Sequence, residues 1–225
     1  MNLDRLVALA EQGRRMVHRP QATGDWYRIN NVDSDRAEVF IYDAIGDWGV
    51  SAGNFVRDLR SITSNTIDLH INSPGGLVFD GVAIYTALKN HNASVTSYVD
   101  GIAASAASFV AMAGNEVIVE KPAKMMIHDA QGMTFGGPAE HREMTNLLDE
   151  LSDTIAEIYA DKAGGSTETW RAAMSKTTWY SATKAVEAGL ADRVANDNKK
   201  AAPEDLRSQQ IRARAHARVA LRRGV

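Results

Sequence analysis

The chain of 225 residues is long enough for one α/β domain with a sizeable core, and its 44% hydrophobic and 24% charged residues are ordinary for a soluble globular protein. A net charge of −3 gives the molecule no strong attraction to nucleic acid or to a membrane surface. The lack of cysteine excludes disulfides, thiolate metal sites and a cysteine nucleophile. No apolar run reaches the roughly 18 residues of a membrane span, and charges interrupt the N-terminus where a signal peptide needs an apolar core, so we expect a cytoplasmic protein.

Residues 1–24 are predicted to form an N-terminal arm, which includes apolar side chains at helical spacing. A single domain is expected over residues 25–195. Its first half alternates short β-rich runs with helical patterns, which predicts βαβ units and a mostly parallel sheet. The strands are apolar enough to suggest that helices cover both faces of this sheet. The predicted strands are 26–29, 37–42, 66–71 and 95–99, and the predicted helices are 51–60, 78–90 and a run that starts beside Ser105.

The second half of the domain contains one long helical pattern, which Pro138 opens and which continues to residue 163. Its apolar stripe is wide enough to pack on another subunit. The other predicted elements are strands at 116–120 and 124–127, a glycine-bearing loop at 131–137, short helices at 167–175 and 182–188, and a last strand at 193–195. Residues 196–225 are predicted to form a basic tail, either solvated or in contact with an acidic partner.

Ser105 is the first candidate for chemistry, because it follows a β-rich run and Gly101 and stands at the predicted start of a helix. Positive partial charge at a helix N-terminus favours a developing anion, and the surrounding alanines allow a substrate backbone to come close. The structural alternative is a serine that only caps an alanine-rich helix. Ser108 is a second serine, which we expect to face the core or to bond back along its helix.

His128 ends the predicted strand 124–127 and opens the glycine-bearing loop, a place from which an imidazole can take a proton from a serine hydroxyl. The alternative is a histidine that is satisfied at a strand edge. Upstream, residues 72–76 read NSPGG, either a simple βα turn or a turn whose glycines aim a backbone N–H at an oxyanion. The GxxxxGK[ST] pattern of a phosphate loop is missing there. No pair of histidines has metal-ligand spacing with nearby carboxylates, so we expect neither a metal nor another cofactor.

Four motifs, in this order, resemble the landmarks of the ClpP-type serine peptidases, the Clp protease proteolytic subunit family. They are INSPGG at 71–76, GIAAS at 101–105, MIH at 126–128 and YSATKAVEAGLAD at 180–192. The resemblance covers about residues 26–195. The chain is also similar to the shorter members encoded in phage and prophage capsid gene clusters, because the Trp179–Tyr180 pair resembles that branch more than the housekeeping enzyme. The implied fold is a crotonase-like ββα superhelix with a protruding handle helix.

The resemblance also implies roles for particular residues. Ser105 matches the family's nucleophile and His128 its base. Gly76 and Ala106 match the backbone donors of its oxyanion hole. The third member of the family's triad is an aspartate, and Thr177 stands at that position here.

The resemblance further implies how substrates and partners are bound. Segments 76–79 and 131–137 match the edges between which an extended peptide lies as an added strand. Helix 139–163 matches the handle that joins two rings, which in this family are stacked and heptameric. The implied partners are peptide or protein substrates, further copies of the chain in a ring, and an AAA+ ATPase or capsid proteins, with no nucleic acid and no membrane.

Thr177 is a departure from the family pattern, and no acid lies close to it in sequence. A carboxylate there would orient the imidazole and stabilise its charged form, whereas a threonine offers at most a neutral hydrogen bond. Three explanations remain open: a Ser–His dyad helped by Thr177, a weak or inactive enzyme, or an acid supplied from elsewhere in the chain. The acids considered for that role are Asp153, Asp161 and Glu168. Asp129, the neighbour of His128, is expected to point to the opposite face of its strand.

The main hypothesis is a serine endopeptidase that works in a self-assembled ring, either in phage capsid maturation or in ClpP-like proteolysis. A catalytically silent scaffold that keeps the fold and the rings is the second hypothesis, and Thr177 motivates it. An acyl-CoA enzyme on the same superhelix is the third, because it shares the oxyanion donors but needs no Ser–His pair.

Overall fold

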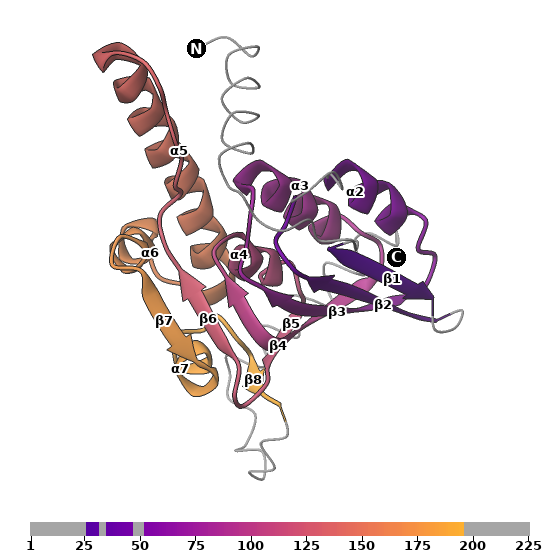
Figure 1. The fold of residues 1–225 in the computed structure, drawn as a ribbon. Coiled ribbons are helices and arrows are strands. Elements are labelled where there is room, and N and C mark those ends of the chain that lie inside the picture. The colour runs from indigo at the N-terminus through magenta and orange to yellow at the C-terminus, as the bar shows by residue number, and fades with distance from the viewer. Residues whose placement is uncertain (1–25, 32–34, 47–51, 196–225) are drawn as a thin grey trace, which may run out of the picture.

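The computed structural model describes residues 26–31, 35–46 and 52–195, which form a mixed α/β structure (Figure 1). The elements are β1 (Tyr27–Asn31), β2 (Arg36–Tyr42), α2 (Ala52–Arg60), β3 (Thr66–Ser73), α3 (Val78–Lys89), β4 (Ser94–Ala104), α4 (Ala106–Ala111), β5 (Glu116–Val119), β6 (Lys124–Ile127), α5 (Pro138–Ala163), α6 (Thr167–Met174), β7 (Thr178–Ser181), α7 (Ala182–Glu187) and β8 (Arg193–Val194). The predicted N-terminal arm and basic tail lie outside the described residues. Within the described ranges, no helix is both long and apolar enough to cross a membrane.

One sheet organises these ranges, with the strand order β1-β2-β3-β4-β5-β8 and with β6 and β7 branching from β4. Strands β2 to β5 and β8 run parallel, whereas β1 and β7 pair antiparallel with β2 and β6. The predicted βαβ units and mostly parallel sheet are therefore confirmed. Strand β4 links the two parts of the sheet, because its first half pairs with β3 and β5 and its residues 102–104 pair with β6.

Strand β4 is longer than the predicted strand 95–99. It continues to Ala104, so the turn before α4 lies at Ser105 and not at Gly101. Gly101 lies inside the strand, where the register with β3 shifts. A Cβ on Gly101 would lie 2.5 Å from the Asn72 side-chain oxygen, so a larger residue here would require the exposed Asn72 side chain to move. The glycine therefore marks a bulge within the strand rather than the end of it.

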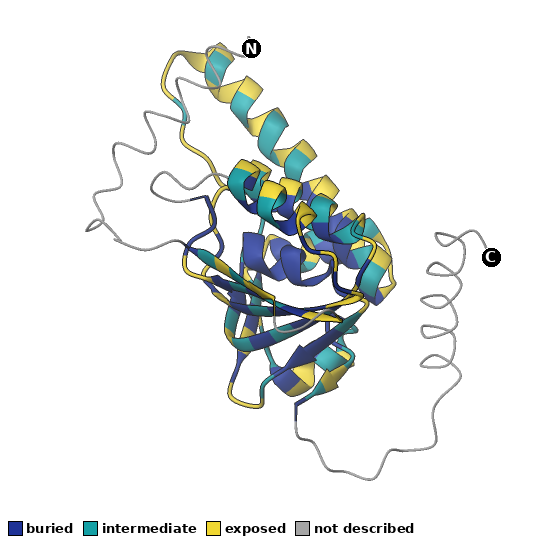
Figure 2. Ribbon diagram, turned by 90° about the vertical axis from the view of Figure 1, so that its right-hand side faces the viewer, coloured by how far each residue is buried: buried dark blue, intermediate teal, exposed yellow. Residues whose placement is uncertain are grey.

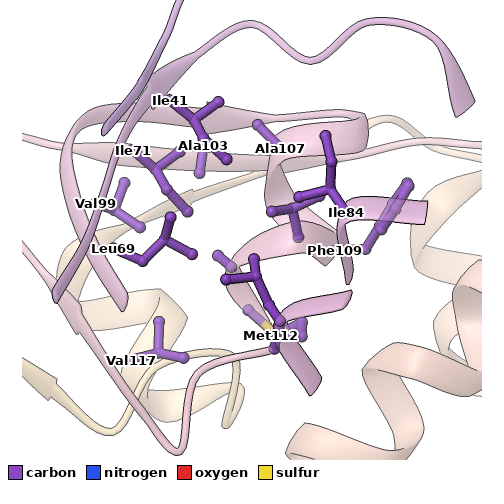
Figure 3. Close-up of a cluster of buried hydrophobic side chains, with 14 of the residues drawn as sticks. Ile41, Leu69, Ile71, Ile84, Val99, Ala103, Ala107, Phe109, Met112 and Val117 are labelled. Carbon is purple, nitrogen blue, oxygen red and sulfur yellow. The ribbon is translucent and has the colours of Figure 1, made fainter. Parts of the chain in front are cut away.

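Helices α2, α3 and α4 pack side by side over one face of the sheet, and the core lies between them and the strands (Figure 1). Along β2, β3 and β4, buried residues alternate with half-buried or exposed ones, so these strands have one covered and one open face. The expectation that helices cover both faces is therefore wrong for these strands. Figure 3 shows labelled core side chains from both layers. Ile84 and Phe109 belong to α3 and α4, Met112 directly follows α4, and the strands contribute Leu69, Ile71 and Val99.

The open face of β1 to β4 carries a row of stacked side chains. The Arg28 guanidinium lies 4.4 Å from the centre of the Phe40 ring, and the Phe40 and His70 ring centres are 4.9 Å apart. Tyr98 stacks on the other side of His70, also at 4.9 Å. The Asp100 carboxylate lies 3.0 Å from His70 Nδ1 and raises the pKa of that imidazole. Ring stacking and polar contacts, rather than helix packing, therefore cover this face.

Helix α5 begins and ends where it was predicted, at Pro138 and Ala163, and its first half projects from the rest of the domain (Figures 1 and 2). All of its buried residues lie from Ser152 onward. The segment before the helix runs beside it, because a Cβ on Gly132 would lie 3.3 Å from side-chain atoms of α5. The inner half of α5 therefore belongs to the core, while the outer half and the preceding segment form a projection.

Candidate active site

Ser105 stands between β4 and α4 with a φ of 53° and a ψ of −126°. A positive φ is strained for a residue that has a Cβ, and such strain is typical of functional positions. The surrounding backbone holds the residue: its N–H donates to Met126 O at 2.9 Å, and its carbonyl accepts from the Ser108 N–H at 2.9 Å. The nucleophile candidate therefore sits on a fixed turn between two regular elements.

A buried hydrogen-bond chain supports the same turn. The Ser108 hydroxyl donates to Ser105 O at 2.5 Å and lies 2.7 Å from the Tyr159 hydroxyl of α5. Because Ser108 donates to the carbonyl, Tyr159 is the donor to Ser108. Burial raises the pKa of the Tyr159 phenol, which therefore stays protonated. Ser108 is thus buried and bonded back along its helix, as expected from the sequence.

His128 directly follows β6, and its Nε2 lies 2.7 Å from Ser105 Oγ. The two side chains meet because β6 pairs with the last residues of β4. The imidazole is half-buried; burial lowers its pKa below 6.5, and the charge of Asp129 acts in the opposite direction. At neutral pH the ring is therefore uncharged and able to accept a proton from the serine hydroxyl.

The glycine turn between β3 and α3 lies against Ser105. A Cβ on Gly75 would lie 2.7 Å from Ser105 Cβ and 2.8 Å from the Ala106 nitrogen, and Gly75 has a φ of 98°. Its carbonyl accepts from the Ile45 N–H at 2.7 Å, which fixes the turn to the neighbouring chain. None of the hydrogen bonds found in the described residues uses the N–H of Gly76 or of Ala106. Both groups are therefore available to a substrate oxygen.

A cavity of about 140 Å³ opens beside these groups. Its lining consists of Gly76, Val78, Ser105, Ala106, Phe109, His128, Asp129, Ala130, Gln131, Ile155 and Tyr159. Its walls are polar and apolar in similar measure, and a cavity that brings together a hydroxyl, an imidazole and backbone N–H donors is typical of an acyl-transfer site.

A larger hollow, of about 740 Å³, lies away from this site, at the ends of α2 and α3. Its lining includes His91, whose two ring nitrogens are both hydrogen-bonded to backbone groups. Nε2 lies 3.2 Å from Leu59 O, and Nδ1 accepts from the Ala93 N–H at 3.1 Å. This histidine is therefore not available as a base, and the candidate chemistry lies in the smaller cavity.

Thr177, at the position of the family's aspartate, immediately precedes β7, a strand that the sequence pattern did not indicate. Thr178 pairs with Ile127 of β6, which puts Thr177 next to His128. The φ of Thr177 is 51°, which is unusual for a β-branched residue and better suited to aspartate or asparagine. In the described part of the chain, no side chain is hydrogen-bonded to Nδ1 of His128.

The acids considered as substitutes are Asp153, Asp161 and Glu168, and none of them contacts the imidazole within the described residues. Asp129 binds Arg171 at 3.0 Å instead of the neighbouring ring. It lies beyond the end of β6 and lines the same cavity as His128, so strand alternation does not decide its direction. Arg171 itself was not singled out in the sequence, because it lies on α6 and is 42 residues from Asp129. The described residues thus form a Ser–His pair in which no carboxylate is hydrogen-bonded to the imidazole.

The Clp protease family matches residues 21–198 of the chain. The ATP-dependent Clp protease proteolytic subunit of Pleurastrum terricola is 33% identical over 130 residues, which are 56% of this chain and 66% of that protein. Subunit 1 from Protochlamydia amoebophila is 30% identical over 177 residues, 75% of this chain and 85% of the relative. The subunit of Ligilactobacillus salivarius is 34% identical over 136 residues, which are 60% of this chain and 69% of that protein. Proteolytic subunits of this kind are serine peptidases, and with this breadth of match the chain belongs to the Clp protease family.

Proposed function

We propose that this chain is a serine endopeptidase in which Ser105 is the nucleophile and His128 the general base. The observation that carries the proposal is the 2.7 Å contact between Ser105 Oγ and His128 Nε2. Beside it lie the N–H groups of Gly76 and Ala106, which no hydrogen bond among the described residues uses. Membership of the Clp protease family supports the same chemistry. An acyl-CoA enzyme would use the N–H donors but would give the Ser–His pair no role.

In the first step, His128 Nε2 takes the proton of Ser105 Oγ while that oxygen attacks the carbonyl carbon of the peptide. The N–H groups of Gly76 and Ala106 donate to the oxyanion that forms. His128 then gives the proton to the leaving amine, which breaks the C–N bond and leaves an ester on Ser105. A water molecule, deprotonated by His128, hydrolyses the ester and restores the serine.

The substrate is an extended peptide that lies as an added strand between residues 76–79 and 131–137. Both segments present exposed apolar side chains, which supports this placement. They are Leu77 and Phe79 on the first segment and Met133 and Phe135 on the second. Main-chain hydrogen bonds would give affinity, and these side chains would select apolar residues of the peptide.

Catalysis is expected to be slow, because no carboxylate of the described residues is hydrogen-bonded to the imidazolium that forms during attack. In serine hydrolases with a complete triad, loss of the aligned acid costs about 10⁴ in rate. Thr177 would contribute at most a neutral hydrogen bond to the ring. The proposed mechanism is therefore a dyad mechanism.

The finer proposal concerns assembly and biological role. The chains form a ring, joined to a second ring through the projecting α5, and cleave capsid proteins during phage or prophage head maturation. The Trp179–Tyr180 pair and the exposed outer half of α5 support this role. An AAA+ ATPase is the alternative partner, and a cytoplasmic location is part of the same proposal. Co-expression with capsid proteins from the same gene cluster tests it, since their cleavage should depend on Ser105.

Ser105→Ala tests the chemistry. It is expected to abolish cleavage of a fluorogenic peptide and of an unfolded protein, while the assembly state measured by size-exclusion chromatography stays the same. Ser94→Ala, at an exposed position at the start of β4, is the matched control and should keep full activity. Equal turnover by the wild type and Ser105→Ala would remove Ser105 from the mechanism.

A catalytically silent scaffold is the second candidate, favoured by the absence of any partner on His128 Nδ1 among the described residues. A fluorophosphonate probe separates the two functions. Labelling at Ser105 supports the peptidase. No labelling, under conditions that label an active relative, supports the scaffold.

A further inference from the structure

The turn after His128 is fastened to helices α5 and α6 at two adjacent residues. The Asp129 carboxylate accepts a hydrogen bond from Arg171 Nη1 of α6, at 3.0 Å. The Ala130 N–H donates to the hydroxyl of buried Ser152 on α5, at 2.9 Å. On the other side of His128, β6 is held in the sheet by β4 and β7. The residue that carries the imidazole is therefore held from both directions along the chain.

Arg171 uses each of its three side-chain nitrogens for a different carboxylate. Besides Asp129, it binds Asp149 through Nη2 at 3.1 Å and Asp153 through Nε at 3.0 Å, both on α5. The Asp129 side chain is 35% exposed, against 66% for Asp149 and 59% for Asp153, so water screens the Asp129 contact least. A planar guanidinium with a fixed fork of donors holds α5, α6 and the turn in one relative placement, which a lysine cannot do.

We propose that Arg171 is a positioning residue for the imidazole of His128 and acts through Asp129. This role rests on the proposed function of the Ser105–His128 pair. In a triad, the acid on Nδ1 orients the ring directly. Here nothing in the described residues binds Nδ1, so the orientation of the ring depends on the backbone that carries it. Arg171 anchors that backbone on its C-terminal side.

The same contact sets the charge beside the base. Burial lowers the pKa of His128, the charge of Asp129 raises it, and the guanidinium on Asp129 offsets that charge. Among the described residues, the charged groups at this turn are Asp129, Arg171 and the two aspartates that Arg171 binds on α5, while the Tyr159 phenol of α5 lines the site. Loss of Arg171 therefore leaves carboxylates without a counter-charge and shifts the His128 pKa upward.

Arg171→Gln tests the role on the full chain, with a fluorogenic peptide measured across a pH range. It is expected to lower kcat about tenfold, to change KM less than about twofold, and to move the acidic midpoint of the kcat profile to higher pH. Arg171→Lys keeps the positive charge but loses the planar set of guanidinium donors. Its kcat profile should therefore have the wild-type acidic midpoint, while its kcat should stay low. Arg57→Gln removes an arginine from an exposed ion pair with Asp58 on α2 and, as the matched control, should change neither.

An unchanged kcat and midpoint in Arg171→Gln would overturn the positioning role. No fluorophosphonate labelling of the wild type would instead overturn the proposed function. In that case the positioning role is decided by an NMR titration of the His128 ring, whose signal is assigned with His128→Ala. A His128 pKa higher in Arg171→Gln than in the wild type supports the role, and an unchanged pKa overturns it. Should Arg171→Gln fail to fold, Asp129→Ala breaks the same contact from the other side, and an unaltered kcat there overturns the role as well.

Discussion

The two nitrogens of the His128 ring have very different surroundings. Nε2 lies 2.7 Å from Ser105, on a turn held by the sheet and by the buried Ser108–Tyr159 pair. Nδ1 has no hydrogen-bond partner in the described residues, and Thr177 stands at the neighbouring position. The Nε2 side of the site, where Ser105 attacks the substrate, is thus built from backbone and buried core residues. The Nδ1 side, which orients the imidazole, depends on single side chains. Changes on the first side should destroy the site, and changes on the second should tune it.

Gly75→Ala should produce the largest effect on activity, because it displaces the turn that carries the nucleophile Ser105. The new Cβ would lie 2.6 Å from Ala104 O and 2.7 Å from Ser105 Cβ, at a φ of 98°. We expect kcat/KM to fall by about 10² to 10³, with a loss of about 1–3 kcal/mol in the free energy of unfolding. Peptide turnover and urea unfolding measure the two quantities.

The matched control for this prediction is Gly165→Ala. Gly165 also has a positive φ, 84°, but a Cβ there meets its nearest atom, Trp170 Nε1, at 3.6 Å, an ordinary contact distance. This variant should keep wild-type turnover. Full activity of Gly75→Ala would show that the glycine turn has no part in catalysis.

Thr177→Asp should have the next largest effect, as a gain. A carboxylate at the family's position would stabilise the imidazolium, and aspartate accepts the φ of 51° more easily than threonine. We expect kcat to rise about tenfold or more in a peptide assay.

Thr177→Asn is the matched control, because it suits the same backbone conformation but supplies no charge. It should change stability rather than rate. If the aspartate variant turns over no faster than the asparagine variant, the missing acid does not limit catalysis.

The pH profile should show the smallest effect. Only the uncharged imidazole accepts the serine proton, and burial lowers the pKa of His128 below 6.5, so kcat/KM should rise through a midpoint below pH 6.5 and then level off. As the pH falls through that midpoint, the ring gains a proton and activity is lost. The profile of Thr177→Asp should have a higher midpoint, because a carboxylate favours the charged ring. A wild-type midpoint above pH 6.5 would contradict the account of the base.

Much of the fold could be predicted from local patterns in the sequence. Helix α5 runs from Pro138 to the residue before Gly164, as a proline start and a glycine stop indicate, and β6 has its predicted bounds. The meeting of Ser105 and His128 was expected from the order of four motifs rather than from any single one, and the two side chains lie 2.7 Å apart. Their catalytic roles stay a prediction.

The features that could not be predicted depend on distant contacts. Strand β7 is short and lies between two helices, and its pairing with β6 is what makes it a strand. The Asp129–Arg171 contact joins residues on separate elements, which no local spacing reveals. Helices were expected on both faces of the sheet because its strands are apolar on both sides. Phe40 and Tyr98 contribute to that pattern, but they are only half-buried and stack on the open face.

Helix α5 also carries a gradient of local stability along its length. Its residues 138–151 include no buried side chain, whereas six buried residues lie between Ser152 and Ala163. Amides of the outer turns can open by fraying from the helix start, but those of the inner turns open only when the core around Tyr159 is disrupted. Protection against hydrogen exchange should therefore increase along one unbroken helix, and the position of that increase marks the boundary between projection and core.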